Sequence, residues 1–360
     1  MAEDVLQKLE PDCKLPSSTR STRRPSWSSP PDVPGLPNAV IITHVFPFLD
    51  RLSWNRLSAS CQEIHKAARA QTEPWPERAV IKYVVCSLTF SPRSDTIACG
   101  CHDAAIRIYG RQKGLWNVLR GHVQSVISIA YSPDGSILAS GDNYSTIRLW
   151  NVMEAYAYVA QISSLTAVLS LAFSPNGTMI ASGGWGTWIR LWRIADVALV
   201  RSREVNKHWS GPMCFSPDGN TIAFPDLSNQ IRLWNLFDDE NDVYLQGHSD
   251  SVNAVVYSPD GTYIASGGDD QTIRIWNTIH LTCDRVIRCH TSSITLIAFS
   301  PDCKTVASVS NDVVIMWVAA TGTVLQKLEN QSKILSIRYA PDGRTFSSAS
   351  YNGRARLWRL

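Results

Sequence analysis

Short runs of alternating apolar and polar residues recur from about residue 80 to the C-terminus, for example VISIAY at 126–131 and VNAVVY at 252–257. Alternation with a period of two is typical of a β-strand that buries one face. Most of these runs are followed by Ser-Pro-Asp-Gly or a close variant. In such a turn Pro presets φ, Asp bonds its own backbone and Gly accepts a positive φ. The pattern therefore predicts a series of β-hairpins.

An aromatic residue closes each of seven units of similar length. The intervals between successive aromatics are 41, 42, 42, 42, 41 and 41 residues, and the aromatics are Tyr109, Trp150, Trp192, Trp234, Trp276, Trp317 and Trp358. Within a unit, an alternating run, a turn, a second short strand, another turn and the strand ending at the aromatic precede a variable fourth segment. Four short antiparallel strands per unit predict one blade, and seven units predict an all-β, seven-bladed propeller over residues 75–360.

The repeated units resemble the WD-repeat family. The resemblance rests on the Gly-His pairs at 121–122 and 247–248, the Ser-Pro-Asp-Gly turns, the IASGG segments and the terminal IRLW, and covers roughly residues 80–360. It implies a closed ring of seven blades. The chain ends two residues after Trp358, so the last unit lacks its own fourth strand. We expect the segment 75–83 to supply that strand.

The family resemblance also implies a hydrogen-bonded set of four side chains within a blade. Only the fifth repeat matches this set fully, with His248, Ser266, Asp270 and Trp276. The sixth repeat offers His290, Ser308, Asp312 and Trp317 but is one residue short before its Trp. The second repeat has Tyr144 where the Asp is expected. We therefore expect the other blades to be pinned more weakly and to depend on strand pairing and apolar contact.

The first seventy-odd residues differ in composition from the repeats. Residues 1–35 are rich in Pro, Ser and Arg, and we expect a disordered tail. Residues 36–72 carry apolar residues at helical spacing, which predicts a small α-helical segment. Leu-Pro at 36–37, VFPFLD at 45–50 and LSASCQEI at 57–64 resemble an F-box. That resemblance implies binding to a Skp-type adaptor of a cullin ubiquitin ligase through Leu36, Pro37, Val45, Phe46, Phe48 and Leu49. The alternative is a helical cap packed against the propeller.

Composition excludes several classes of protein. Apolar residues make up 44% of the chain and the net charge is only +3, which does not favour a nucleic-acid partner. No apolar stretch reaches the length of about 18 residues that a membrane helix needs. The acidic N-terminus does not resemble a secretory signal. The nine cysteines are irregularly spaced without a CxxC, which indicates reduced thiols in an intracellular protein of the cytoplasm or nucleus.

Patterns typical of catalysis or cofactor binding are absent from the sequence. There is no phosphate-binding loop, nucleophile elbow or HExxH. Cys99 and Cys101 should face the core, with His102 on the opposite side of the strand, so they do not form a metal site. The Arg found two residues before six of the aromatics is interpreted as a repeated structural position rather than an RNA-binding ladder. The acidic run 238–242 is interpreted as a solvated hairpin tip. We expect neither enzyme activity nor a cofactor.

Variable residues at one rim of the ring form the predicted binding surface. Because strands alternate in direction, the turn after each second strand and the segment leading into each first strand lie on the same rim. Varied loops on a repeated scaffold usually carry the binding face of a repeat protein. The residues are His102, Asn143, Tyr144, Trp185, Leu227, Asp269, Asn311 and Tyr351, with Trp209 from a loop leading into a first strand.

These features predict a non-enzymatic scaffold with protein partners. The F-box-like segment favours a substrate-recruiting adaptor of an SCF-type ubiquitin ligase, with a client protein held on the rim. The alternative is a general WD-repeat scaffold of another complex, with the N-terminal helices as a cap.

Overall fold

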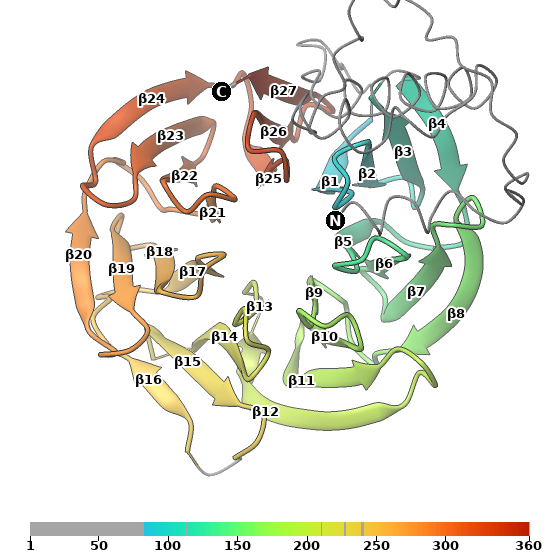
Figure 1. Cartoon of the computed structure of the whole chain (residues 1–360), viewed down its shortest axis with the longest axis horizontal. Helices are drawn as coiled ribbons and strands as arrows, with labels where there is room; N and C mark the ends of the chain where they lie inside the picture. Colours follow the sequence, from blue (N-terminus) through green and yellow to red (C-terminus); the bar gives the residue numbers. More distant parts are fainter. Residues whose placement is uncertain (1–82, 112–113, 210, 227, 239–240, 360) are drawn as a thin grey trace, which may run out of the picture. The chain divides into compact units, whose positions relative to one another are not determined.

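The computed structural model describes residues 83–111, 114–209, 211–226, 228–238 and 241–359. These residues form a ring of seven antiparallel sheets around a central opening, as Figure 1 shows. Within these ranges every regular element is a strand, and no helix long and apolar enough to cross a membrane is found. The predicted seven-bladed all-β propeller is confirmed.

Each sheet is formed from strands that follow one another in the sequence. The first sheet contains β1 (Val85–Phe90), β2 (Thr96–Cys101), β3 (Ile106–Gly110) and β4 (Gly114–Leu119). The second contains β5 (Val126–Tyr131), β6 (Ile137–Asp142), β7 (Thr146–Asn151) and β8 (Ala157–Ser163). The third contains β9 (Ser170–Phe173), β10 (Met179–Gly183), β11 (Gly186–Arg193) and β12 (Leu199–Trp209).

The remaining four sheets repeat this order. The fourth contains β13 (Cys214–Phe215), β14 (Thr221–Asp226), β15 (Gln230–Asn235) and β16 (Val243–Leu245). The fifth contains β17 (Val252–Tyr257), β18 (Tyr263–Gly268), β19 (Ile273–Asn277) and β20 (Cys283–Ile287). The sixth contains β21 (Leu296–Phe299), β22 (Thr305–Ser310), β23 (Val313–Val318) and β24 (Val324–Glu329). The seventh contains β25 (Ile334–Tyr339), β26 (Thr345–Ser350) and β27 (Ala355–Arg359).

The predicted turn chemistry is present between the first and second strands. In the fifth sheet the Ser258 hydroxyl donates to the Asp260 carboxylate over 2.5 Å, and Gly261 has a φ of 75°. The Tyr263 N–H donates to the Ser258 hydroxyl oxygen over 2.9 Å, which fixes the start of the second strand. A side chain at a positive φ is strained, so glycine is the residue suited to this corner.

Apolar side chains fill the space between neighbouring sheets. The second and third strands of one sheet pack on the first three strands of the next. Ile106 and Ile108 of β3, for example, lie in one buried cluster with Ile129, Leu138 and Trp150 of the second sheet. Burial of such large side chains is worth about 1.5–3 kcal/mol each and is the main force that holds sheet to sheet.

The ring closes where the seventh sheet meets the first. Val85 and Leu88 of β1 lie in one buried cluster with Ala349 of β26 and Leu357 of β27. The Leu88 N–H also donates to the Ser336 hydroxyl of β25 over 3.3 Å. Within the described residues the seventh sheet has three strands, and most of the segment 75–83 expected to complete it lies outside them. That expectation therefore stays a prediction.

Both predicted N-terminal segments also lie outside the described residues. They are the tail at 1–35 and the F-box-like helical segment at 36–72, with its predicted adaptor contacts.

Candidate interaction rim

A hydrogen-bonded set of four side chains lies beneath the loops of the fifth sheet. His248 contacts Ser266 through Nε2 (2.7 Å) and Asp270 through Nδ1 (2.9 Å), and the Trp276 indole N–H donates to the Ser266 hydroxyl over 2.8 Å. Burial lowers the pKa of His248, although its bond to Asp270 acts in the opposite direction. The predicted set is confirmed. It ties the segment leading into β17 to β18 and to the third strand, β19.

The second sheet contains a complete set as well, which corrects the expectation that only the fifth repeat has one. His122 contacts Ser140 (2.7 Å) and Asp142 (2.9 Å), and the Trp150 indole donates to Ser140 over 2.9 Å. The carboxylate comes from Asp142, two residues before Tyr144. It is placed correctly because Oδ1 accepts the N–H groups of Tyr144, Ser145 and Thr146, which leaves Oδ2 for His122.

The sixth and seventh sheets hold partial sets. His290 contacts Ser308 over 2.8 Å, and Trp317 donates to Ser308 over 3.3 Å. Among the described residues Asp312 makes no hydrogen bond to His290, so the shortened loop breaks the set. In the seventh sheet Asn330 replaces the His and donates to Ser348 over 3.4 Å.

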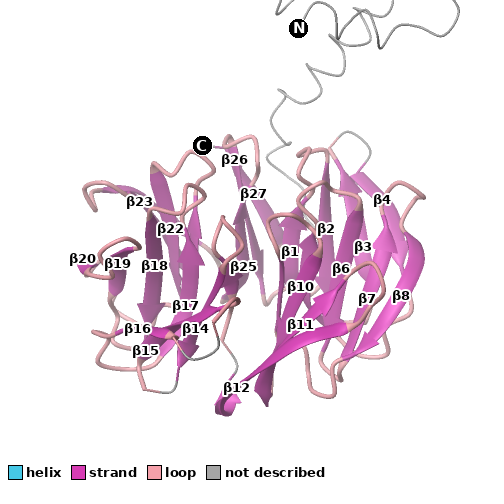
Figure 2. Ribbon diagram, turned by 60° about the horizontal axis from the view of Figure 1, so that its bottom comes forward, coloured by secondary structure: helices cyan, strands magenta, loops and turns pink. Residues whose placement is uncertain are grey.

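The loops between second and third strands form one edge of the ring, here called the loop rim. Figure 2 shows the strands running across the thickness of the ring, with loops at both ends. The predicted residues of these loops that the structure describes are all exposed, and they are His102, Asn143, Tyr144, Trp185, Asp269, Asn311 and Tyr351. The three aromatic side chains are exposed by 75% at Tyr144, 63% at Trp185 and 67% at Tyr351. The prediction that these residues share an exposed rim therefore agrees with the structure.

Backbone hydrogen bonds hold each of these loops against the segment that leads into the first strand. The N–H groups of Asn143, Asp269 and Tyr351 donate to the carbonyls of Ser125, Ser251 and Lys333, over 3.1, 2.8 and 2.9 Å. Side chains also link adjacent sheets, since the Ser125 hydroxyl donates to the His102 carbonyl over 2.9 Å. The loop rim is thus a hydrogen-bonded backbone frame that presents different side chains.

Two predicted rim positions have no described side chain. Leu227 lies outside the described residues, and of Trp209 only the backbone is described. Trp209 is the last residue of β12 rather than part of a loop, because this strand extends to pair Trp209 with Gly186 across a bulge. Sequence analysis missed two apolar rim residues, Val123 and Leu165, which are 84% and 75% exposed. Both residues lie in segments that lead into a first strand, and this position in the sequence could have identified them as rim residues.

The opposite edge of the ring is called the turn rim. It carries the turns between first and second strands and those between third and fourth strands. Its large exposed apolar residues include Met153, Phe237 and Ile279, at 62%, 77% and 79%. Among the described turns Phe237 is its one large exposed aromatic residue, whereas the loop rim has three.

The cysteines of β2 and the repeated arginines have structural roles. Cys99 and Cys101 are buried in the core while His102 is exposed, as predicted, and burial raises the pKa of Cys101 to about 11. Within the described ranges no three His, Cys, Asp or Glu residues are placed to hold a metal ion. Five of the repeated arginines donate hydrogen bonds within the ring, and they are Arg107, Arg190, Arg232, Arg274 and Arg356.

Asp242 corrects the interpretation of the acidic run as a solvated tip. Its side chain is only 4% exposed and accepts bonds from Arg203 of β12 and, over 2.6 Å, from Arg232 of β15. The carboxylate therefore joins the third and fourth sheets.

Comparison with known families and proteins agrees with this geometry. The family model described as "WD domain, G-beta repeat" matches residues 81–110, 114–151, 160–193, 241–277, 281–317 and 322–359, together more than half of the chain. The gap between 193 and 241 contains most of the fourth sheet. There β13 has two residues, and Phe224 occupies the position of the Ser that the Trp contacts in other sheets.

Curated relatives match short stretches of the chain. COMPASS component SWD1 of Saccharomyces cerevisiae is 37% identical over 70 residues, which cover 18% of this chain and 16% of that protein. Nuclear distribution protein nudF 1 of Talaromyces marneffei is 35% identical over 72 residues, covering 19% and 16%. Protein SOF1 of S. cerevisiae is 34% identical over 70 residues, covering 18% and 14%. The chain therefore matches no more than about a sixth of the length of these relatives.

Proposed function

Because this chain belongs to the WD domain, G-beta repeat family, we propose that it is a non-enzymatic scaffold that holds a protein partner on its loop rim. The observation that carries the proposal is the exposure of Tyr144, Trp185 and Tyr351 on one edge of a hydrogen-bonded frame. Aromatic side chains bury a large area with little loss of rotamer entropy and are enriched among residues that dominate binding energy.

Further features support a scaffold over an enzyme. The histidines of the second and fifth sheets are buried and used in holding the fold, and the described cysteines of the core have raised pKa values. Catalytic nucleophiles and bases need accessible side chains with pKa values near the working pH. SWD1 is named as a component of COMPASS, which supports membership of an assembly for the present chain. The seven described cysteines are free thiols, which supports an intracellular site.

The experiment compares two pairs of substitutions on the full chain. Tyr144→Ala with Trp185→Ala removes two rim aromatics, and Met153→Ala with Ile279→Ala removes two exposed apolar residues of the turn rim. Partners recovered with the wild-type protein are identified by mass spectrometry, and their affinities are then measured with purified proteins. We expect the rim pair to weaken binding at least tenfold and the turn pair to leave it unchanged. Equal binding by the wild-type and rim-pair proteins would contradict the proposal.

A more specific candidate is a substrate-recruiting adaptor of a cullin-type ubiquitin ligase. The observation that favours it is the F-box resemblance of residues 36–72, above all Leu-Pro at 36–37 and Val45, Phe46, Phe48 and Leu49. In this proposal the N-terminal segment binds a Skp-type adaptor while the loop rim holds the client.

Direct binding to a purified Skp-type adaptor tests this candidate. The full chain is compared with a variant that lacks residues 36–70 and with Phe46→Ala/Phe48→Ala. Micromolar binding that both changes abolish, with the propeller still folded, would support the adaptor. An intact chain that does not bind leaves the general scaffold, and loss of propeller stability in the variants would instead indicate a helical cap.

A further inference from the structure

The first strands, which surround the centre of the ring, contain one position that breaks the repeat. Each first strand ends at an aromatic residue. The residue just before that aromatic is small or apolar in six sheets and charged in the seventh. These residues are Thr89, Ala130, Ala172, Cys214, Val256, Ala298 and Arg338. A single charged residue at a position that is uncharged in the other six sheets points to a role other than folding.

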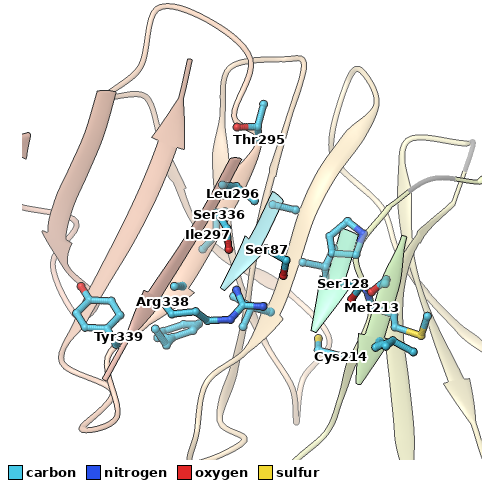
Figure 3. Close-up of a pocket in the computed structure, with 18 of the residues that line it drawn as sticks. Ser87, Ser128, Met213, Cys214, Thr295, Leu296, Ile297, Ser336, Arg338 and Tyr339 are labelled. Carbon is cyan, nitrogen blue, oxygen red and sulfur yellow. The ribbon is translucent and has the colours of Figure 1, made fainter. Parts of the chain in front are cut away.

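Arg338 projects from β25 into this channel. Figure 3 shows its guanidinium reaching away from β25 into the cavity, while Tyr339 points to the other side of the strand. The cavity has a volume of about 590 Å³. The residue is exposed to the solvent of the channel, and desolvation by the nearby channel wall lowers the pKa of Arg338. Guanidinium stays protonated at physiological pH even so.

No acidic side chain among the described residues of the cavity lining balances this cation. Among the described residues that line the cavity, Arg338 is the sole charged one. Its side chain makes one hydrogen bond among the described residues, from Nη1 to the carbonyl of its neighbour Ile337 over 3.0 Å. A guanidinium has five N–H donors, so four of them remain for water or a ligand. A charge without a partner beside the channel wall attracts a counter-ion, because the nearby protein screens it less than bulk water does.

Two hydroxyl groups on the neighbouring first strands add donors to the same cavity. Ser87 of β1 and Ser128 of β5 both line it, and among the described residues neither hydroxyl makes a hydrogen bond. The equivalent Ser170 and Ser336 differ, because they accept the N–H groups of Met213 and Leu88 over 3.0 and 3.3 Å. The unused hydroxyls thus lie on the two first strands that follow β25 around the ring.

We infer that the channel binds a small oxyanion, a phosphate or a carboxylate, through the Arg338 guanidinium. The planar guanidinium matches two oxygens of such a group, and a serine hydroxyl is a suitable further donor. Apolar side chains such as Met213, Leu296 and Ile297 line other parts of the wall, which suits a compact ligand with a short hydrocarbon part. The cavity volume falls in the range of small-molecule sites. The inference is independent of any partner on the loop rim.

Calorimetric titration of the purified full chain with inorganic phosphate, and separately with succinate, tests the inference. Ionic strength is held constant so that screening does not change. We expect saturable binding of at least one probe at millimolar concentration or below. Arg338→Gln should weaken it at least tenfold, and Arg338→Lys less, since the charge remains but the planar fork is lost. Arg288→Gln is the matched control because Arg288 is exposed and lies outside the cavity lining.

A second measurement needs no variant. Phenylglyoxal modifies accessible guanidinium groups, and mass spectrometry reports the rate at Arg338 and Arg288 in the wild-type protein. The effective anion should slow modification at Arg338 and leave Arg288 unaffected. The preferred probe also distinguishes a phosphate site from a carboxylate site. Absence of saturable binding of both probes, unchanged binding by Arg338→Gln, or equal protection of both arginines would each overturn the inference.

Discussion

The Arg111 guanidinium and the Asp342 carboxylate lie 2.6 Å apart although 231 residues separate them in the sequence. Arg111 follows β3 of the first sheet, and Asp342 lies in the turn between β25 and β26 of the seventh. The two side chains are only 6% and 15% exposed. The pair therefore connects the first and last sheets across the junction that closes the ring.

The first prediction is that Asp342→Asn weakens ring closure. The amide keeps the acceptor for the Arg344 N–H but removes the negative charge that faces the nearly buried Arg111 guanidinium, so their ion pair is lost. We expect the free energy of unfolding to fall by about 2–3 kcal/mol, below the full cost of breaking a completely buried pair. Urea unfolding followed by tryptophan fluorescence measures it.

Asp134→Asn is the matched control for that substitution. Asp134 occupies the same position of the turn in the second sheet and bonds Ser132 and Ser136, without an arginine. The chain already has Asn at this position of the third sheet, where Asn176 accepts the Ser174 hydroxyl over 2.7 Å. We expect the control to change stability by less than about 1 kcal/mol. Equal losses in the two variants would show that the ion pair contributes nothing beyond the turn.

The second prediction concerns Asp142, which sequence reasoning passed over in favour of position 144. Asp142→Ala removes the acceptor of three backbone N–H groups and of the His122 ring. Several buried donors then lose their partner, at a cost of about 1–3 kcal/mol for each group left unsatisfied. We expect Asp142→Ala to lower the midpoint of thermal unfolding clearly. Tyr144→Ala, on the exposed loop, should change it little, and the reverse order would contradict the assignment.

The fold was predictable because the same sequence pattern occurs in seven successive units. The strands at 126–131 and 252–257 have the predicted bounds, since alternation and the following turn fix both ends of a strand. Exposure of Tyr144, Trp185 and Tyr351 also followed from their place in loops. The set around Asp142 was missed because a carboxylate two residues earlier reaches the same histidine only when the loop curls around it. That loop conformation is a property of the backbone, and no residue count reports it.

Contacts between sheets were harder to predict than the sheets themselves. The sequence places Asp242 in an acidic run, where solvation is the reasonable expectation. Its burial depends on β12 running eleven residues, which brings Arg203 next to the fourth sheet. In the same way, nothing local in the sequence pairs Arg111 with Asp342. Such contacts depend on ring closure, so they become visible only in the folded structure.

The third prediction is a loss of stability on acidification to which His290 contributes. Burial lowers the pKa of His290 to about 4, against an ordinary value of 6.5, so below pH 6.5 the unfolded chain binds more protons than the folded one. The part of the free energy of unfolding that depends on neutral His290 is therefore fully present above pH 6.5 and is lost as the pH falls towards 4. Burial also lowers the pKa values of His122 and His248, which act in the same direction.

His290→Asn should make the stability less dependent on pH. Asn330 shows that an amide is tolerated at the equivalent position of the seventh sheet. Between pH 7 and pH 4.5 we expect the variant to lose about 2–3 kcal/mol less than the wild-type protein, measured by urea unfolding at both values. His280→Asn, on an exposed turn, serves as the control. An identical pH dependence of wild type and His290→Asn would rule out this role for His290.

The last prediction tests how closely neighbouring sheets approach. A Cβ atom on Gly141 of β6 would lie 2.4 Å from Cγ1 of Val168, which leads into the first strand of the next sheet. The same relationship recurs at Gly267, whose Cβ would lie 2.4 Å from Cγ2 of Ile294. Both glycines therefore permit a close approach of β-branched side chains between sheets. Gly141→Ala should overpack this contact and cost about 1–3 kcal/mol.

Val168→Ala removes the Cγ1 methyl that would lie 2.4 Å from the new Cβ but keeps the Val168 Cβ at 2.8 Å, so the two substitutions should compensate each other in part. Alone, Val168→Ala leaves a cavity and destabilises the protein. In Gly141→Ala/Val168→Ala the added methyl occupies part of that cavity. We therefore expect the double variant to lose clearly less free energy of unfolding than the sum of the single changes, with a coupling of about 1 kcal/mol or more in a double-mutant cycle. Strict additivity would mean that the neighbouring sheet moves away to accept the methyl, and the propeller would then be less tightly packed at this junction than the structure indicates.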